Sequence, residues 1–360
     1  MKKWGFLGLA LALTLTAACG GATTDTAAEG GDGADGAETT AADGGSRLDA
    51  VIARGQLVCG VDGGIPGFSF VDEGGTYSGL DVDVCRAVAA ALFDDPDAVE
   101  YRRLDSTERF TALSGGEVDM LSRNTTWTVS RDTQVGMEFA PTTFYDGQGM
   151  MVRTDAGIAT LEDFGGKAVC VETGTTTELN LTDQMRKLGV EFEPVVFQDA
   201  DAAYAAYDEG RCEGMTSDKS QLIARRSTLP SPDDHTLLEV TMSKEPLGPL
   251  TVNNDSAWFD VVKWVTYGLF QAEEFGITSA NIGDFAGSDD PNIARFLGEE
   301  GTLGDDMGIS NDFMARVVTH VGNYGEIYES NLGQDSQFGL ERGQNALWTE
   351  GGLMYSPPFR

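Results

Sequence analysis

Residues 122–131, with the sequence SRNTTWTVSR, concentrate hydrogen-bond donors in a strongly acidic chain. The stretch holds two arginines, one asparagine and three threonines around Trp127, in a protein with 58 acidic and only 24 basic residues. An arginine guanidinium binds a carboxylate through two parallel hydrogen bonds, which suits Arg131 in particular. These residue types predict noncovalent binding of a charged group, and the stretch offers few groups for covalent catalysis.

Two further places, at Asp218 and at Thr175 with Thr176, offer groups that could meet a ligand. Each place follows a predicted strand and stands at the start of a predicted helix. Thr176 can add a hydroxyl and a backbone N–H at a helix N-terminus, which is a natural seat for an anion. The alternative is that these residues are ordinary helix caps, a common role for aspartate and threonine.

The rest of the chain alternates between strand and helix patterns. The first set comprises predicted strands 56–61, 99–104 and 117–122 and predicted helices 79–93 and 106–116. The second set comprises strands 167–172, 192–197, 212–217 and 235–240 and helices 175–189, 201–210 and 218–226. Ser106 is the expected N-cap of its helix and Gly115 the expected end. This alternation predicts an α/β fold with mainly parallel sheets, in two units of about one hundred residues each.

A helical region follows the second unit. Residues 255–276 carry Trp258, Val261, Val262, Val265 and Leu269 at helical spacing, which predicts an amphipathic helix. A glycine-rich segment around 282–310 predicts loops with one short helix at 291–298, and residues 311–333 predict a helix that glycines end or bend.

Several separated segments carry a family resemblance. They are residues 67–70, 77–93, 109–152, 174–181, 210–222 and 243–249, in this order. Together they resemble the polar amino-acid substrate-binding proteins of ABC importers, solute-binding protein family 3, and within that group the general L-amino-acid-binding branch. The resemblance covers roughly residues 47–360, including a tail at 321–333 and 343–358 that shorter relatives lack.

The resemblance implies a two-lobed periplasmic-binding-protein-like fold with two crossover hinge strands and a C-terminal helical extension. Lobe 1 would contain residues 47–145 and 249–360, and lobe 2 residues 146–248. The crossings would lie near 145–151 and 242–250. Ligands of such sheets bind beyond the carboxyl ends of the strands, so the site would be the cleft between the lobes.

The resemblance also implies how a free L-amino acid is held. Arg131 would clamp the α-carboxylate, with Asn124 and Thr126 bonding the same head group, and Asp218 would meet the α-ammonium from the other lobe. Both charges lose water in a closed cleft, so each must be paired. A ligand that bridges the lobes binds the closed arrangement better and shifts the hinge equilibrium towards it.

The same resemblance indicates which residues would contact the side chain of the bound amino acid. Arg109 and Ser106 fall where relatives contact that side chain, and Arg123 flanks the donor-rich stretch. Either arginine would favour glutamate or aspartate, whereas the branch as a whole implies several polar amino acids, including glutamine and asparagine. The alternative for Arg109 is a solvated side chain, or one paired with Glu108 or Asp105.

Cysteine and histidine usage argues against a zinc site, and neither a metal nor a cofactor is expected. No two cysteines have CxxC spacing, and the only histidines, His235 and His320, lie far from any cysteine. An even number of cysteines after Cys19 permits disulfides in an exported chain, with three possible pairings. We favour pairing within each proposed lobe, which joins Cys59 to Cys85 and Cys170 to Cys212.

The formal net charge of −34 argues against polyanionic partners. Such a surface repels phosphate backbones, so nucleic-acid binding is not expected. The expected partners are a free amino acid and the permease subunits of an ABC importer, and the protein is expected to act as a monomer.

Residues 1–18 begin with two lysines, continue with an apolar stretch and end in small residues, and this order is typical of a secretory signal. Cys19 follows Ala17 and Ala18, and this arrangement resembles a bacterial lipobox. It predicts a lipoprotein signal peptide and a lipidated Cys19. The alternative is a secreted protein without a lipid anchor. Residues 19–46 contain no large apolar residue apart from that cysteine and predict a disordered linker. The chain is thus expected to be exported and anchored to the outer face of the cytoplasmic membrane, or to lie in the periplasm.

Two other function classes share this fold. A cleft enzyme such as a cyclohexadienyl-type dehydratase needs a poised general acid or base, but neither histidine lies in a cleft motif. An extracellular sensor domain is the third class. We therefore predict a binding protein and not an enzyme.

Overall fold

Two five-stranded sheets organise residues 45–360, the part of the chain that this computed structural model describes. The predicted signal peptide, Cys19 and almost all of the predicted linker lie outside these residues. Ser46, at the end of that linker, caps helix α1 (Arg47–Arg54) by accepting a hydrogen bond from the N–H of Leu48.

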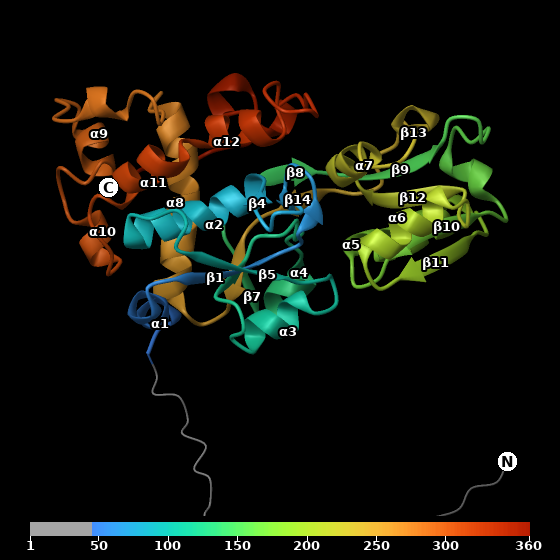
Figure 1. The fold of residues 1–360 in the computed structure, drawn as a ribbon, viewed down its shortest axis with the longest axis horizontal. Helices are drawn as coiled ribbons and strands as arrows, with labels where there is room; N and C mark the ends of the chain where they lie inside the picture. Colours follow the sequence, from blue (N-terminus) through green and yellow to red (C-terminus); the bar gives the residue numbers. More distant parts are fainter. Residues whose placement is uncertain (1–44) are drawn as a thin grey trace, which may run out of the picture. The chain divides into compact units, whose positions relative to one another are not determined.

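The first sheet has the strand order β5-β1-β6-β15-β7, and we call the half built on it lobe 1 (Figure 1). Its strands are β1 (Leu57–Val61), β5 (Val99–Arg103), β6 (Met120–Leu121), β7 (Met137–Phe139) and β15 (Leu250–Val252). Strand β1 pairs in parallel with β5 and β6, whereas β15 pairs antiparallel with β6 and β7. The last of these strands comes from a distant part of the chain, so lobe 1 is discontinuous in sequence.

The second sheet has the order β11-β10-β12-β9-β13, and the half built on it is lobe 2. Its strands are β9 (Gln148–Arg153), β10 (Ala168–Glu172), β11 (Glu193–Phe197), β12 (Gly214–Asp218) and β13 (His235–Leu237). Its helices are α5 (Thr176–Leu188), α6 (Ala200–Asp208) and α7 (Lys219–Arg226). Strand β10 pairs in parallel with β11 and β12, so the carboxyl ends of β10 and β12 meet at one edge.

Two crossing strands lie where the chain passes between the sheets. Strand β8 (Phe144–Asp146) pairs antiparallel with β14 (Glu245–Leu247). A third small sheet in lobe 1 has the order β2-β3-β4, with β2 at Gly64–Ile65, β3 at Ser69–Val71 and β4 at Tyr77–Ser78. The paired crossing strands give the two lobes a common hinge.

The core of lobe 1 gathers around two long helices, α2 (Leu80–Phe93) and α8 (Ser256–Glu274). All five apolar residues that predicted the amphipathic helix at 255–276 are buried, and the indole N–H of Trp258 donates to the carbonyl of Asp119 at 2.8 Å. The C-terminal helices α9 (Pro291–Phe296), α10 (Leu303–Asp306), α11 (Phe313–Val321) and α12 (Tyr324–Asn331) follow α8 in lobe 1 (Figure 1). The break between α11 and α12 falls at Gly322 and Asn323, within the segment where glycines predicted a bend.

Some predicted boundaries were wrong. Helix α3 (Arg109–Ser114) begins later than expected, and Ser106 is not its cap. The carboxylate of Asp105 accepts the N–H groups of Thr107 and Glu108 at 2.8 and 2.9 Å, because an ionised carboxylate is the stronger acceptor. Strand β6 spans only two residues of the predicted strand 117–122, since it pairs with β1 only at Cys59 and Gly60.

Two disulfides join Cys59 to Cys85 and Cys170 to Cys212. The first links β1 to α2 within lobe 1, and the second links β10 to the start of the segment leading into β12 within lobe 2. The pairing favoured from the sequence is thus confirmed.

Candidate ligand-binding site

A cavity of about 30 Å³ lies between the two lobes, and we call it the ligand cavity. All nine residues predicted to contact a ligand line it, and they are Ser106, Arg109, Arg123, Asn124, Thr126, Arg131, Thr175, Thr176 and Asp218. Six come from lobe 1, two of them after β5 and four after β6, and the other three come from lobe 2, two after β10 and one at the end of β12. The structure therefore brings together residues that are far apart in the sequence.

Arg131 lies in the short helix α4 (Val129–Thr133), which Thr128 caps by accepting the N–H of Arg131. Its guanidinium is buried, donates to the carbonyl of Thr126 at 2.8 Å and lies 5.3 Å from the centre of the Phe110 ring. Burial lowers the pKa of Arg131 to about 10, partly offset by Glu245. No carboxylate forms a salt bridge with Arg131 among residues 45–360, so much of its hydrogen-bonding capacity faces the cavity.

Asp218 ends strand β12 and occupies the N-cap position of α7, yet its side chain makes no capping hydrogen bond. The carboxylate is buried, and its Oδ1 has no hydrogen-bond partner within the described residues. Burial raises the pKa of Asp218 well above its usual value, and the nearby Asp146 and Glu245 raise it further. The alternative of an ordinary helix cap is therefore contradicted at this position.

Two threonine hydroxyls from opposite lobes converge on one buried carboxylate. Thr126 and Thr176 donate to the same oxygen of Glu245 at 2.6 and 2.8 Å, and their own hydroxyl oxygens lie 3.3 Å apart. Thr175 is the N-cap of α5, since its hydroxyl accepts the N–H of Glu178. The cap interpretation is thus correct for Thr175, while Thr176 stands at the first helical position beside the cavity.

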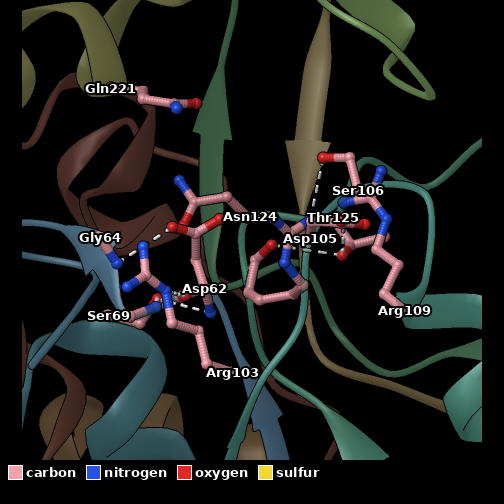
Figure 2. Close-up of polar contacts among 12 residues, drawn as sticks. Asp62, Gly64, Ser69, Arg103, Asp105, Ser106, Arg109, Asn124, Thr125 and Gln221 are labelled. Atoms are coloured by element: carbon pink, nitrogen blue, oxygen red, sulfur yellow. Dashed lines mark hydrogen bonds and ion pairs between the residues drawn. The ribbon is translucent and has the colours of Figure 1, made fainter. Parts of the chain in front are cut away.

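The remaining arginines differ in their pairing. Arg123 donates to Asp62 at 2.5 Å and to the Ser106 hydroxyl at 3.3 Å. Arg109 is buried and donates to the Thr125 hydroxyl at 3.3 Å and to the Gly174 carbonyl of lobe 2 at 3.4 Å, so it is neither solvated nor paired with Glu108 or Asp105. Figure 2 shows Ser106, Thr125 and Arg109 as one group and Gly64, Ser69 and Arg103 around Asp62 as another.

The three arginines of the ligand cavity repel one another, and the nearby carboxylates of Glu172 and Asp62 offset this repulsion only in part. Arg109 has its pKa lowered well below the usual value, first by burial and then by the charges of Arg123 and Arg131. Its Nε has no hydrogen-bond partner in the described part of the chain. A negatively charged ligand in the cavity would relieve both the repulsion and the unpaired donor.

Asn124 adopts a left-handed backbone conformation, with φ of 46°, and its side-chain amide is unpaired at both atoms among residues 45–360. Its backbone N–H donates to Oδ2 of Asp81 at 3.1 Å, and the Ser122 hydroxyl donates to Oδ1 of Asp81 at 3.4 Å. Asp81 lies in the first turn of α2 and is buried, so this helix holds the turn that carries Asn124.

Asp81 gives the protein a stability that depends on pH. Burial raises its pKa from 3.8 to about 7. The folded state favours the neutral carboxyl. The stability that Asp81 contributes is therefore fully present at a pH below its unfolded pKa of 3.8, and it is lost as the pH rises through the folded pKa of about 7. Denaturant unfolding at pH 5 and pH 8 should give a lower free energy of unfolding at pH 8, with Asp81 contributing on the order of a few kcal/mol.

The matched variant for this prediction is Asp81→Asn, which keeps an acceptor for Asn124 and removes the titration. Its free energy of unfolding should change less between the two pH values than that of the unmodified protein. Some dependence should remain, since burial also raises the pKa of Asp146 to about 6. An equal change in both proteins would contradict the role of Asp81.

Sequence reasoning did not single out several other residues of the ligand cavity. They are Asp62, Glu172, Thr177, Ser217 and Gln221. Asp62 directly follows β1, and Glu172 is the last residue of β10, so both stand at carboxyl ends of strands. The rule that placed Asp218 at a strand end would also have found these two carboxylates. Glu245, which both threonines contact, lies within the segment 243–249 that carried part of the family resemblance.

Among residues 45–360, no group of three or more histidine, cysteine, aspartate or glutamate side chains is arranged to hold a metal ion. No helix in the same range has both the length and the hydrophobicity to cross a bilayer.

Comparison with known families gives a match over residues 57–262 to the bacterial extracellular solute-binding proteins, family 3. The chain belongs to this family. The match spans more than half of the protein and includes all nine predicted site residues.

Similar proteins within family 3 extend the match over most of the chain. The general L-amino acid-binding periplasmic protein AapJ of Rhizobium johnstonii is 50% identical over 87% of this chain and 92% of its own length. The glutamate/glutamine/aspartate/asparagine-binding protein BztA of Rhodobacter capsulatus is 47% identical over 88% of this chain and 94% of its own length. A solved periplasmic binding protein from Brucella ovis with glutathione bound has 47% identity and a TM-score of 0.85, covering 88% of this chain and all of that one.

These findings confirm the family, the two-lobed periplasmic-binding-protein-like fold and the C-terminal helices that the sequence predicted. The similar family 3 proteins are named as amino-acid-binding proteins, and this supports the binding interpretation over the dehydratase alternative.

Proposed function

We propose that the protein captures free L-amino acids in the ligand cavity and delivers them to the permease of an ABC importer. The observation that carries this proposal is that Arg131 from lobe 1 and Asp218 from lobe 2 line the same cavity. The two groups have opposite charge, and neither is neutralised by a direct ion pair in the described residues. An α-carboxylate and an α-ammonium on one carbon atom supply the two missing partners.

Each remaining site residue has a place in this proposal. The unpaired amide of Asn124 and the hydroxyls of Thr126 and Thr176 surround the head group, with Thr175 fixing the turn. Arg109 and Ser106 would meet the ligand's side chain. Arg123, already paired with Asp62, would act mainly by charge.

The specificity we propose is for polar or acidic amino acids, over a broad range. The names of the relatives support it, since one is a general L-amino acid-binding protein and another binds glutamate, glutamine, aspartate and asparagine. The Brucella ovis relative holds glutathione, so a ligand longer than one amino acid is compatible with this fold.

The cellular setting is proposed from the sequence. We expect export through the signal at 1–18, lipidation at Cys19 and a linker to residue 46, with the protein held at the outer face of the cytoplasmic membrane as a monomer. The lobe boundaries at 145/146 and 248/249 are part of the same proposal, and the pairing of β8 with β14 supports them.

A thermal-shift panel over the twenty amino acids tests the proposal, followed by calorimetric titration of those that raise the melting temperature. A ligand at 100 times its dissociation constant stabilises the native state by about 2.7 kcal/mol. Stabilisation by polar or acidic amino acids and no product from prephenate would support binding. Absence of any stabilisation, or turnover of prephenate, would overturn the proposal.

Closure of the cleft depends on Gly174 in the turn before α5. This glycine has φ of +72°, and a Cβ there would lie 3.2 Å from the Ser106 carbonyl oxygen of lobe 1. Gly174→Ala should therefore hold the lobes apart and weaken binding of L-glutamine by about tenfold, measured by calorimetry.

Gly166→Ala is the matched control, because Gly166 lies in the same lobe with φ of +71° and has no atom within 4 Å of its Cβ position. Both variants should lose a similar free energy of unfolding, about 1–2 kcal/mol for a left-handed alanine. Equal affinities of the two variants for L-glutamine would show that contact between Gly174 and Ser106 does not limit closure.

A further inference from the structure

The first crossing strand, β8, is held by different lobes on the two sides of one peptide bond. In Figure 1 it lies where the lobes meet, between α12 of lobe 1 and α7 of lobe 2. Phe144 and Tyr145 contact residues 275–360, which follow α8 and which we call the C-terminal extension. Asp146, the next residue, bonds to α7. The hinge therefore has a sharply defined position in this strand.

Asn345 joins the C-terminal extension to the strand. It lies in the short helix η4 (Gly343–Asn345) and is 4% exposed. Its Oδ1 accepts the N–H of Tyr145 at 2.7 Å, and its Nδ2 donates to the carbonyl of the same residue at 3.2 Å. One buried side-chain amide thus pairs with both backbone groups of Tyr145, as a residue of a neighbouring antiparallel strand would.

Two tyrosines of α12 hold the preceding part of the strand. The hydroxyl of Tyr324 donates to the Thr143 carbonyl at 2.7 Å. The ring of Tyr328 stacks on that of Phe144, with the ring centres 6.1 Å apart and an angle of 6° between the planes. The C-terminal extension therefore contacts each of residues 143–145.

Arg342 fixes the turn that carries Asn345. Its Nη1 and Nη2 donate to the two carboxylate oxygens of Glu273 in α8 at 3.0 and 3.1 Å, and its Nε donates to the Asn345 carbonyl at 2.9 Å. A bidentate pair of this kind is geometrically specific. The amide of Asn345 is thus positioned against the strand by a helix from the core of lobe 1.

Beyond the peptide bond between Tyr145 and Asp146, the strand is attached to lobe 2. The Asp146 carboxylate accepts the backbone N–H and the hydroxyl of Ser220 in α7, and the Gly147 carbonyl accepts the N–H of Lys219 at 2.9 Å. Two adjacent residues are therefore attached to different lobes. Rotation of one lobe against the other has to take place between them.

We propose that Asn345 is a positioning residue for ligand capture, which confines bending of the first crossing strand to the junction of Tyr145 and Asp146. This inference rests on the proposed function, since capture is closure of the two lobes around an amino acid. The match to family 3 ends at residue 262, so Asn345 and both tyrosines of α12 lie beyond it. The C-terminal extension thus acts on a hinge that belongs to the matched region.

Confinement of the hinge favours closure through conformational entropy. Without Asn345, residues 143–145 could bend as well, and the open protein would gain conformations that the closed protein lacks. The closed fraction of the ligand-free protein would then fall. Because the ligand binds the closed arrangement, its apparent dissociation constant would rise in proportion.

Calorimetric titration of Asn345→Ala with L-glutamine tests the inference. The variant should bind L-glutamine about fivefold more weakly than the unmodified protein. Hydrogen exchange at the Tyr145 amide should be faster, because its N–H loses its acceptor. Tyr324→Phe removes only the hydroxyl bond to Thr143 and should weaken binding about twofold.

Asn311→Ala is the matched control within the C-terminal extension. The side chain of Asn311 also bonds to backbone groups, since it accepts the N–H of Gly304 at 3.0 Å and donates to the carbonyls of Gly298 and Gly301. All three partners lie between α9 and α11. The melting temperature should fall by a similar amount in both asparagine variants, whereas the affinity should fall only where the hinge contact is removed.

Equal affinities of Asn345→Ala and Asn311→Ala for L-glutamine would overturn the inference and leave the proposed function intact, because the extension would then only stabilise lobe 1. Unchanged hydrogen exchange at Tyr145 would also overturn it. If Asn345→Ala does not fold, Tyr324→Phe carries the test, and full affinity in that variant would overturn the inference. Failure of the unmodified protein to bind any of the twenty amino acids would instead remove the proposed function, and the inference with it.

Discussion

Replacement of Arg131 by glutamine should weaken the binding of L-glutamine by at least about 100-fold, because a buried α-carboxylate would lose its charged partner. In the structure the guanidinium is held by the Thr126 carbonyl and the Phe110 ring, and no carboxylate pairs with it in the described residues. Removing one partner of a buried ion pair costs about 3–5 kcal/mol. Calorimetric titration of the purified variant measures the loss directly.

The control for this variant is Arg102→Gln, because the side chain of Arg102 in β5 is 58% exposed and does not line the ligand cavity. This control should bind L-glutamine normally. The melting temperature of ligand-free Arg131→Gln should stay close to that of the unmodified protein, since the ligand-free site loses no salt bridge. A dissociation constant within about threefold of the original would show that Arg131 does not hold the carboxylate.

Asp218→Asn should have opposite effects on binding and on stability. The carboxylate of Asp218 is buried with Oδ1 unpaired, and burial together with Asp146 and Glu245 raises its pKa. Ionisation of Asp218 therefore costs stability in the ligand-free fold, and an amide of the same shape avoids that cost. The variant should melt about 3 °C or more above the unmodified protein at pH 7.5 and lose L-glutamine affinity by about 100-fold or more.

Asp183→Asn is the matched control in the same lobe, because Asp183 is exposed on α5 and pairs only with Arg186. It should leave both the melting temperature and the affinity nearly unchanged. A raised melting temperature with retained binding in Asp218→Asn would mean that another group accepts the ammonium. A lowered melting temperature would mean that the carboxylate stabilises the fold.

The sequence predicted those helices and strands whose pattern depends only on neighbouring residues. The helix expected at 79–93 is α2 (Leu80–Phe93), and the strand expected at 167–172 is β10, because apolar periodicity and capping residues act within a few residues. Strand β6 was predicted too long, since the length of a strand depends on a partner that is distant in sequence. The cap of α3 was misassigned because the helix begins later, at Arg109, after a turn in which the Asp105 carboxylate accepts the N–H groups of Thr107 and Glu108.

The residues of the ligand cavity could be predicted where they stand at the end of a strand or within a family motif. All nine proposed residues line one cavity, but their individual roles stay predictions. What the sequence did not reveal is how the polar groups pair with one another. That Glu245 accepts from both Thr126 and Thr176, and that Asp62 neutralises Arg123, depends on loops from different sheets meeting in space.

The two cystine bridges each close a loop inside a single lobe. The two disulfides thus brace the halves separately, and among residues 45–360 no disulfide links one lobe to the other. The salt bridge between Arg103 and Asp201, by contrast, joins the two lobes through exposed side chains, so a high salt concentration should weaken it.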